Sequence, residues 1–161
     1  MEIELKLLIA PEHVNAFRRH RLIRDHACGK SSSQQLVSTY FDTPDLYLKQ
    51  HQAALRVRKQ GRLWIQTLKG GGRVDAGLHQ RHEWECAVTG RHIDPAQLLP
   101  LIDDPAARAL IDKPGLSTRL QEMFTTSFRR TVWMLRLPRG AEVELALDQG
   151  VVDGGGRQSV I

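Results

Sequence analysis

The sequence contains few cysteines and no long apolar run. Its two cysteines, Cys28 and Cys86, lie far apart and lack the spacing of metal ligands. Two cysteines cannot build the disulfide framework of a small secreted protein, so we expect a reducing, cytoplasmic setting. Charged residues interrupt the first apolar stretch within a few positions, so we expect neither a signal peptide nor a transmembrane helix.

Two common functional motifs are also missing. The glycines at 70–72 are not followed by Gly-Lys-Ser/Thr, so they form no P-loop, and we expect a flexible hairpin loop there. The spacing of His79 and His82 is not that of a zinc site, and we expect both at the surface or in a wall. A P-loop nucleotide site and a zinc centre are therefore excluded at these positions.

The chain does contain an excess of positive charge. Its 161 residues, enough for one domain with a real core, include 23 Lys and Arg against 18 Asp and Glu. This balance suggests an anionic partner such as phosphates or nucleic acid. Arg18, Arg19 and Arg21 on a predicted helix would suit RNA, but such clusters are more commonly an exposed helix flank. We therefore do not expect nucleic acid to be the partner.

The N-terminal residues alternate between charged and apolar side chains. In an extended chain, Glu2, Glu4 and Lys6 share one face, and the intervening apolar residues point the other way. Carboxylates two residues apart on a strand are about 6–7 Å apart, which allows both to reach one hard cation.

The same alternation recurs along the chain. It predicts strands at 36–43, 54–59, 63–69, 80–88, 124–137 and 142–148, and the last residues indicate the opening of another strand. The charged face of these strands carries both signs: Glu2, Glu4, Lys6, Arg56, Arg58, Lys69, Arg81, Glu83, Glu85, Glu144 and Asp148.

Helices are predicted between the strands. They cover residues 11–24, a short turn at 45–49, a region that starts at Asp94 with Pro95 in its first position, and 105–113. We expect Leu98, Leu99, Leu101 and Ile102 to form the apolar face of the third region, residues 28–35 to be a loop and residues 116–123 a linker.

A sheet that is apolar outside and charged inside can close into a barrel with helices around it. An open sheet with one solvated face explains the same pattern equally well. Charges crowded into a barrel must be neutralised by each other or by a ligand. A polyphosphate with a divalent cation would satisfy both signs, because arginine and lysine bind phosphate oxygens and carboxylates bind the metal.

The order of the motifs resembles the CYTH domain of the triphosphate tunnel metalloenzyme superfamily. The pattern is most similar to the bacterial inorganic triphosphatase branch, whose members often carry a helical CHAD domain downstream. The motifs span almost the whole chain: Glu2-x-Glu4-x-Lys6, Tyr40-Phe41-Asp42-Thr43, Leu55-Arg56-Val57-Arg58, Thr67-Leu68-Lys69-Gly70, Arg81-x-Glu83-x-Glu85, Phe124-x-Thr126-x-Phe128-x-Arg130 and Glu144-x-x-x-Asp148-x-Gly150.

The resemblance implies an α+β fold, an antiparallel eight-stranded β-barrel that is open as a tunnel with helices packed outside. It implies hydrolysis of inorganic triphosphate to diphosphate and phosphate with Mg²⁺ or Mn²⁺. The implied metal ligands are Glu2, Glu4, Glu144 and Asp148. The implied phosphate ligands are Lys6, Arg56, Arg58, Lys69, Arg81 and Arg130, with Glu83 and Glu85 on the tunnel wall. Catalysis would rest on Glu4, Lys6 and Arg58, and Glu4 or a later acidic residue would orient the attacking water.

The chain departs from the family pattern at its end. Family members close the tunnel with a last strand that carries another Glu-x-Glu pair, and this chain stops at Ile161 before such a pair. We therefore expect residues 1–161 to be one CYTH domain that lacks its final strand, with exposed edges available for dimerisation. An adenylyl cyclase, a thiamine triphosphatase and a non-catalytic polyphosphate- or nucleotide-binding module remain as alternatives.

Overall fold

The computed structural model describes the backbone of residues 2–75, 78–155 and 157–160, and side chains for residues 4–70 and 82–155. Within these ranges, eight strands form one antiparallel sheet in the order β1-β5-β4-β3-β2-β6-β7-β8. Their bounds are β1 Glu2–Leu5, β2 Ser32–Asp42, β3 Ala54–Gln60, β4 Leu63–Asp75, β5 Leu78–Val88, β6 Gln121–Arg136, β7 Glu142–Gly154 and β8 Arg157–Val160.

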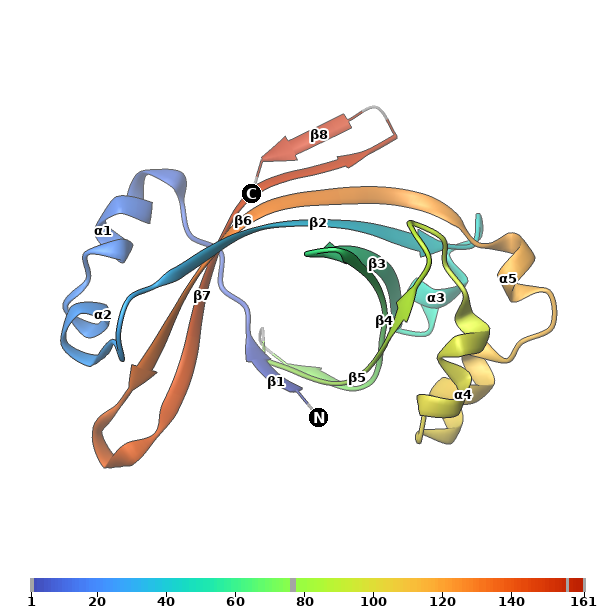
Figure 1. Ribbon diagram of the computed structural model, residues 1–161, viewed down its shortest axis with the longest axis horizontal. Helices are drawn as coiled ribbons and strands as arrows, with labels where there is room; N and C mark the ends of the chain where they lie inside the picture. Colours follow the sequence, from blue (N-terminus) through green and yellow to red (C-terminus); the bar gives the residue numbers. More distant parts are fainter. Residues whose placement is uncertain (1, 76–77, 156, 161) are drawn as a thin grey trace.

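The sheet curls round until its first strand lies opposite its middle (Figure 1). Strands β2 and β6 form one side of the curl, β3 and β4 the next, and β5 and β1 face β2 and β6 across it. The predicted α+β fold with eight antiparallel strands and helices outside is confirmed. In the described ranges, the edge strands β1 and β8 do not pair with each other, so strand pairing leaves the curl open there.

Short helices lie outside the sheet. They are η1 Pro11–His13, α1 Val14–Arg18, α2 Arg21–His26, α3 Tyr47–Gln50, η2 Pro95–Gln97, η3 Leu99–Leu101, α4 Pro105–Ile111, α5 Leu116–Arg119 and η4 Pro138–Gly140. Among the described residues, no helix has the length and apolar character needed to span a membrane.

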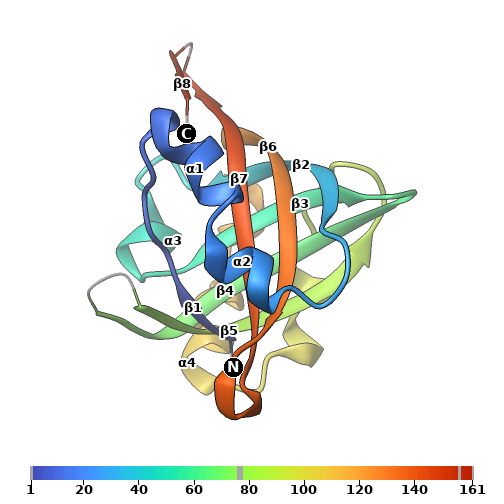
Figure 2. The same ribbon diagram turned by 90° about the vertical axis from the view of Figure 1, so that its left-hand side faces the viewer.

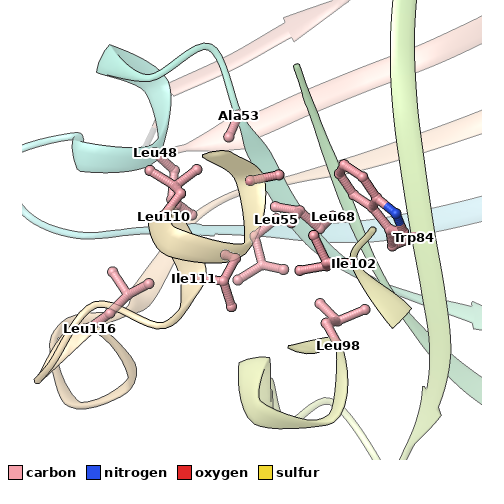
Figure 3. Close-up of a cluster of buried hydrophobic side chains, with 11 residues drawn as sticks. Leu48, Ala53, Leu55, Leu68, Trp84, Leu98, Ile102, Leu110, Ile111 and Leu116 are labelled. Atoms are coloured by element: carbon pink, nitrogen blue, oxygen red, sulfur yellow. The ribbon is translucent and has the colours of Figure 1, made fainter. Parts of the chain in front are cut away.

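The hydrophobic core lies on the convex side of β3, β4 and β5. Leu55, Leu68 and Trp84 point outward from these strands and pack against Leu98 and Leu110 from the covering helices (Figure 3). Leu55, Leu68 and Leu98 are completely buried. Because side chains alternate along a strand, the residues between these core positions must point into the curl.

A second group of helices covers β6 and β7. Helices α1 and α2 lie across the outer side of these strands (Figure 2), where the ring of Phe17 meets that of Trp133 edge-on at 6.4 Å. Arg18 Nη2 donates to Gln149 Oε1 at 2.7 Å. Both helix groups therefore lie outside the curl and leave its concave side to polar residues.

Several predicted boundaries are wrong because contacts with distant strands outweigh local preference. Strand β2 begins at Ser32, within the predicted loop, since its first residues pair with β6 and Gln35 Nε2 donates to Ser127 Oγ at 3.0 Å. The glycines at 70–72 belong to β4, which pairs with β5 beyond them after a register shift. Strand β7 likewise continues past Asp148 to Gly154.

The helical predictions are wrong in three places. The helix expected at 11–24 is interrupted at His20, whose backbone is extended and whose Nδ1 accepts from Leu22 N. The region after Asp94 forms two 3-10 turns, and Leu101 of the expected apolar face is 46% exposed. The expected linker at 116–123 contains α5 and the start of β6.

Asp42 anchors the turn that follows β2. Its buried carboxylate accepts from the backbone N of Thr43 at 2.7 Å, Leu48 at 2.8 Å and Lys49 at 3.0 Å. A side chain that satisfies these donors fixes α3 against the sheet beside the start of β3. Asp42, the third residue of the Tyr-Phe-Asp-Thr motif, therefore has a structural role.

We predict that Asp42→Ala lowers the free energy of unfolding by about 2–4 kcal/mol, because it leaves buried backbone donors without acceptors. Urea unfolding followed by circular dichroism measures this change. Asp45→Ala is the matched control, since Asp45 is exposed and its carboxylate contacts the exposed Arg119 and the Thr43 side chain rather than the backbone donors of Leu48 and Lys49. An equal loss in both variants would contradict the anchoring role.

Candidate functional site

The strand register brings the charged residues of distant motifs onto the concave face of the sheet. Directly paired residues point to the same side of a sheet. Arg56 pairs with Tyr40 and Thr67, and Lys69 pairs with Glu83. The same register pairs Arg58 with Ser38, Ser38 with Thr126, Thr67 with Glu85, Arg130 with Asp148, and Glu2 with Arg81.

A network of ion pairs occupies the wall formed by β3, β4 and β5. Glu83 accepts from Arg56 at 3.2 Å and contacts Lys69 Nζ at 2.9 Å. Glu85 lies 3.9 Å from Arg56 and accepts from Thr67 Oγ1 at 2.6 Å. The Arg56 side chain is only 12% exposed, and its buried Nε has no hydrogen-bond partner among the side chains that the structure describes. This wall therefore has a donor available for a further acceptor.

Arg58 differs from the other cations of this face. Its Nε donates to Ser38 Oγ at 2.8 Å, but no carboxylate in the described residues forms an ion pair with it. Burial and then the charge of Arg56 lower the pKa of Arg58, and the charge of Arg130 acts in the same direction. Tyr40 and Glu83 oppose these effects, and the resulting pKa of Arg58 is about 10. A half-buried guanidinium among like charges is a site for an anion.

The opposite side of the concave face is acidic. Arg130 donates to both oxygens of Asp148, at 2.7 and 2.6 Å. These hydrogen bonds raise the pKa of Arg130 against the effect of burial, and the charges of Asp148, Glu4 and Glu144 raise it further. Glu4 also pairs with Lys6 at 3.3 Å.

A pocket of about 420 Å³ lies where β1 and the segment after it approach β6 and β7. Its lining includes Glu4, Lys6, Phe128, Arg130 and Asp148. It thus unites the N-terminal motif with residues from the other end of the sequence.

Not every predicted site residue is placed. The side chains of Glu2 and Arg81 lie outside the described residues, although their backbones pair with each other. Glu144 is exposed on β7, and no group of three or more potential ligands in the described part of the chain is close enough to hold a metal ion. Arg129 is exposed and lies on the opposite face from Arg130, as the alternation of side chains along the strand predicted.

Neutral residues complete the site, and the charge pattern gave no signal for them. The Ser38 hydroxyl accepts a hydrogen bond from Arg58, and the Thr67 hydroxyl donates one to Glu85. Phe128 lies against Gly150, where a Cβ would clash with the Phe128 ring and with the carbonyl of Ser127. Close packing against β6 therefore requires a glycine at position 150. A glycine within a strand pattern often marks such a close approach of backbones, so its place two residues after Asp148 was the available signal.

An aromatic pair lies at one end of the concave face. The rings of Tyr40 and Phe124 stack at 4.7 Å with an interplanar angle of 14°. They line a pocket of about 440 Å³ that also contains Ala54, Leu55 and Met123. A largely apolar pocket thus lies at this end of β2, β3 and β6, which the sequence did not indicate.

Comparisons with known proteins agree with this geometry. The sequence model of the CYTH domain matches residues 1–157. An inorganic triphosphatase from Haemophilus influenzae is 32% identical over 163 residues, which cover 96% of this chain and 41% of that protein. The chain therefore spans about two fifths of the length of this curated relative.

The fold is also found in a solved structure. A protein from Hippeastrum, described as a candidate adenylyl cyclase that reveals a dominant triphosphatase activity, superposes with a TM-score of 0.56. The sequences are 20% identical, and the match covers 99% of this chain and 77% of that one. At this identity the match concerns the fold.

We predict that Arg58→Gln leaves the free energy of unfolding at neutral pH unchanged or raises it. The lowered pKa means that the folded protein holds the Arg58 proton less tightly than the unfolded chain does. Charged Arg58 therefore lowers stability at every pH below about 10, and this effect fades only as the pH rises above that value. Urea unfolding at neutral pH measures the change.

Arg56→Gln is the matched comparison, because it removes the same charge from a cation that is paired with Glu83. This variant should lose about 1–3 kcal/mol of stability. A larger loss in Arg58→Gln than in Arg56→Gln would contradict the assignment of Arg58 as an uncompensated cation.

Proposed function

The chain belongs to the CYTH domain family, and we propose that it binds a triphosphate chain and a divalent cation on its concave face and hydrolyses inorganic triphosphate to diphosphate and phosphate. The observation that carries this proposal is Arg58. A half-buried cation without an ion pair in the described residues, beside a second cation with an unsatisfied Nε, favours an anion as ligand.

The phosphate chain would contact the cationic wall. Arg56, Arg58 and Lys69 extend toward one region from neighbouring strands, and their guanidinium and ammonium groups suit phosphate oxygens. Lys6, Arg81 and Arg130 would contribute further contacts from β1, β5 and β6. Stabilisation of the charge that develops on the transferred phosphoryl group would account for most of the rate.

The acidic side has the donor chemistry for a divalent cation, although its carboxylates do not gather into a group of three among the described residues. Glu4, Glu144 and Asp148 offer hard carboxylate oxygens, and the charges of all three act on the Arg130 guanidinium. Together with Glu2 they would hold Mg²⁺ or Mn²⁺, which when bound would neutralise phosphate oxygens and lower the pKa of a coordinated water. Glu83 and Glu85 would keep the wall cations in position, and Glu4 would orient the attacking water.

A second candidate function is the hydrolysis or cyclisation of an organic triphosphate such as ATP or thiamine triphosphate. The stacked Tyr40 and Phe124 beside the cationic wall favour it, because an apolar pocket of about 440 Å³ suits a planar ring. Phosphate release from inorganic triphosphate, ATP and thiamine triphosphate under the same conditions separates the two functions.

The remaining expectations concern the setting of the protein. We propose that the domain acts in the cytoplasm, that its exposed sheet edges allow dimerisation, and that the full-length protein carries a helical CHAD domain downstream. A non-catalytic binding module is the alternative if triphosphate binds without turnover.

We predict that Glu4→Ala reduces phosphate release from inorganic triphosphate by about 100-fold or more, because it removes both a cation ligand and the group that orients water. Phosphate release is measured with and without Mg²⁺ or Mn²⁺. Glu12→Ala, which removes an exposed carboxylate from η1 outside the curl, should retain full activity.

Equal rates for wild type and Glu4→Ala would remove Glu4 from the mechanism. Tight triphosphate binding by the wild type without metal-stimulated turnover would identify a binding module instead. Circular dichroism of each variant establishes that the fold survives, as expected for a residue at the rim of the sheet.

A further inference from the structure

Carboxylates hold most of the cations whose side chains the structure describes on the concave face. Glu83 contacts Arg56 at 3.2 Å and Lys69 at 2.9 Å. On the opposite side, Asp148 contacts Arg130 at 2.6 Å. Each of these contacts orients a cationic side chain, and each also offsets part of the positive charge that would attract an anion. Orientation by a carboxylate therefore weakens the cation as an anion ligand.

Arg58 is held in a different way. Its Nε donates to Ser38 Oγ at 2.8 Å, and the side chains that the structure describes provide neither an ion pair for it nor an acceptor for its Nη atoms. A hydroxyl accepts a hydrogen bond without carrying a net charge, so it fixes the guanidinium and leaves the positive charge intact. Because only Nε is engaged, the donors of both Nη atoms remain for a ligand.

Ser38 is itself firmly placed for this contact. It lies on β2, where its backbone pairs with Arg58 of β3 on one side and with Thr126 of β6 on the other. The residue is only 1% exposed. A hydroxyl on a strand that is paired on both sides, and that water does not reach, is a fixed point against which the longer Arg58 side chain is oriented.

We propose that Ser38 is a positioning residue, which orients Arg58 toward the phosphate chain without neutralising it. Ser38 acts through Arg58 and does not itself contact the ligand. A carboxylate at position 38 would form the ion pair that Arg58 lacks in this structure, and it would compete with phosphate for the guanidinium. The inference rests on the proposed function in taking a triphosphate chain as the ligand.

The test is the binding of inorganic triphosphate in the absence of metal, measured by isothermal titration calorimetry. Ser38→Ala should raise the dissociation constant about fivefold, because one orienting hydrogen bond is lost. In an Arg58→Gln background, the same substitution should change the constant by less than about twofold, because the side chain that Ser38 orients is absent.

Ser127→Ala is the matched control for this double-mutant cycle. The Ser127 hydroxyl accepts from Gln35 Nε2 at 3.0 Å on the outer face of the same two strands. Its removal deletes a similar hydrogen bond from β6 and should change the dissociation constant of triphosphate by less than about twofold.

A second pair of variants tests the need for a neutral group at this position. Ser38→Asn and Ser38→Asp introduce side chains of nearly equal size with an oxygen that can accept from Arg58, but only Ser38→Asp adds a negative charge. Ser38→Asp should bind triphosphate at least about tenfold more weakly than Ser38→Asn, because its carboxylate pairs with the guanidinium. This comparison decides the matter if Ser38→Ala does not fold.

Equal weakening by Ser38→Ala in the wild-type and Arg58→Gln backgrounds would overturn the inference, as would equal binding by Ser38→Asp and Ser38→Asn. Neither readout depends on turnover. Binding that is coupled through Arg58, without phosphate release in the presence of Mg²⁺ or Mn²⁺, would overturn the proposed hydrolysis and leave the positioning role standing. Metal-stimulated hydrolysis whose kcat and KM are unaltered in Ser38→Ala would do the reverse, and a wild type that binds no triphosphate would overturn both.

Discussion

The neutralisation of opposite charges on the inside of a curled sheet is the constraint on which the structure depends. Charges that leave bulk water destabilise a fold unless each finds a partner. Glu83 holds Arg56 and Lys69 on one wall, and Asp148 holds Arg130 on the other. These pairs allow one face of the sheet to carry ligand-binding groups while the protein stays folded without the ligand.

Stability comes from the other face of the same strands. Leu55 and Leu68 are completely buried beneath α4 and its neighbours, whereas Arg56 and Lys69, one residue further along, point into the curl. The apolar core and the charged face are therefore built from alternating positions of one sequence. Because the helices lie outside (Figure 1), the concave face is free to be optimised for binding rather than for packing.

The sequence predicts the fold class and the facing of the charged residues, since alternation fixes which side of a strand a residue occupies. It also separates Arg130 from Arg129 correctly, because neighbours on a strand face opposite ways. It does not predict which carboxylate pairs with which cation, because these contacts depend on register between distant strands. The extension of β2 into residues 32–35 and of β4 through the glycines at 70–72 escaped prediction for the same reason.

The aromatic pair of Tyr40 and Phe124 escaped prediction for the same reason. Tyr40 and Phe124 are more than 80 residues apart, and only the antiparallel register of β2 and β6 brings their rings together. Neutral residues that shape a site in this way leave no charge signal in the sequence.

The concave face is the surface that we propose binds a triphosphate chain. The most direct test is a crystal structure of the protein with Mn²⁺ and a non-hydrolysable imido analogue of triphosphate. The account predicts electron density for the phosphate chain inside the curl, in contact with Arg56, Arg58 and Lys69. Density confined to the outer surface, beside Arg18 and Arg129, would contradict it.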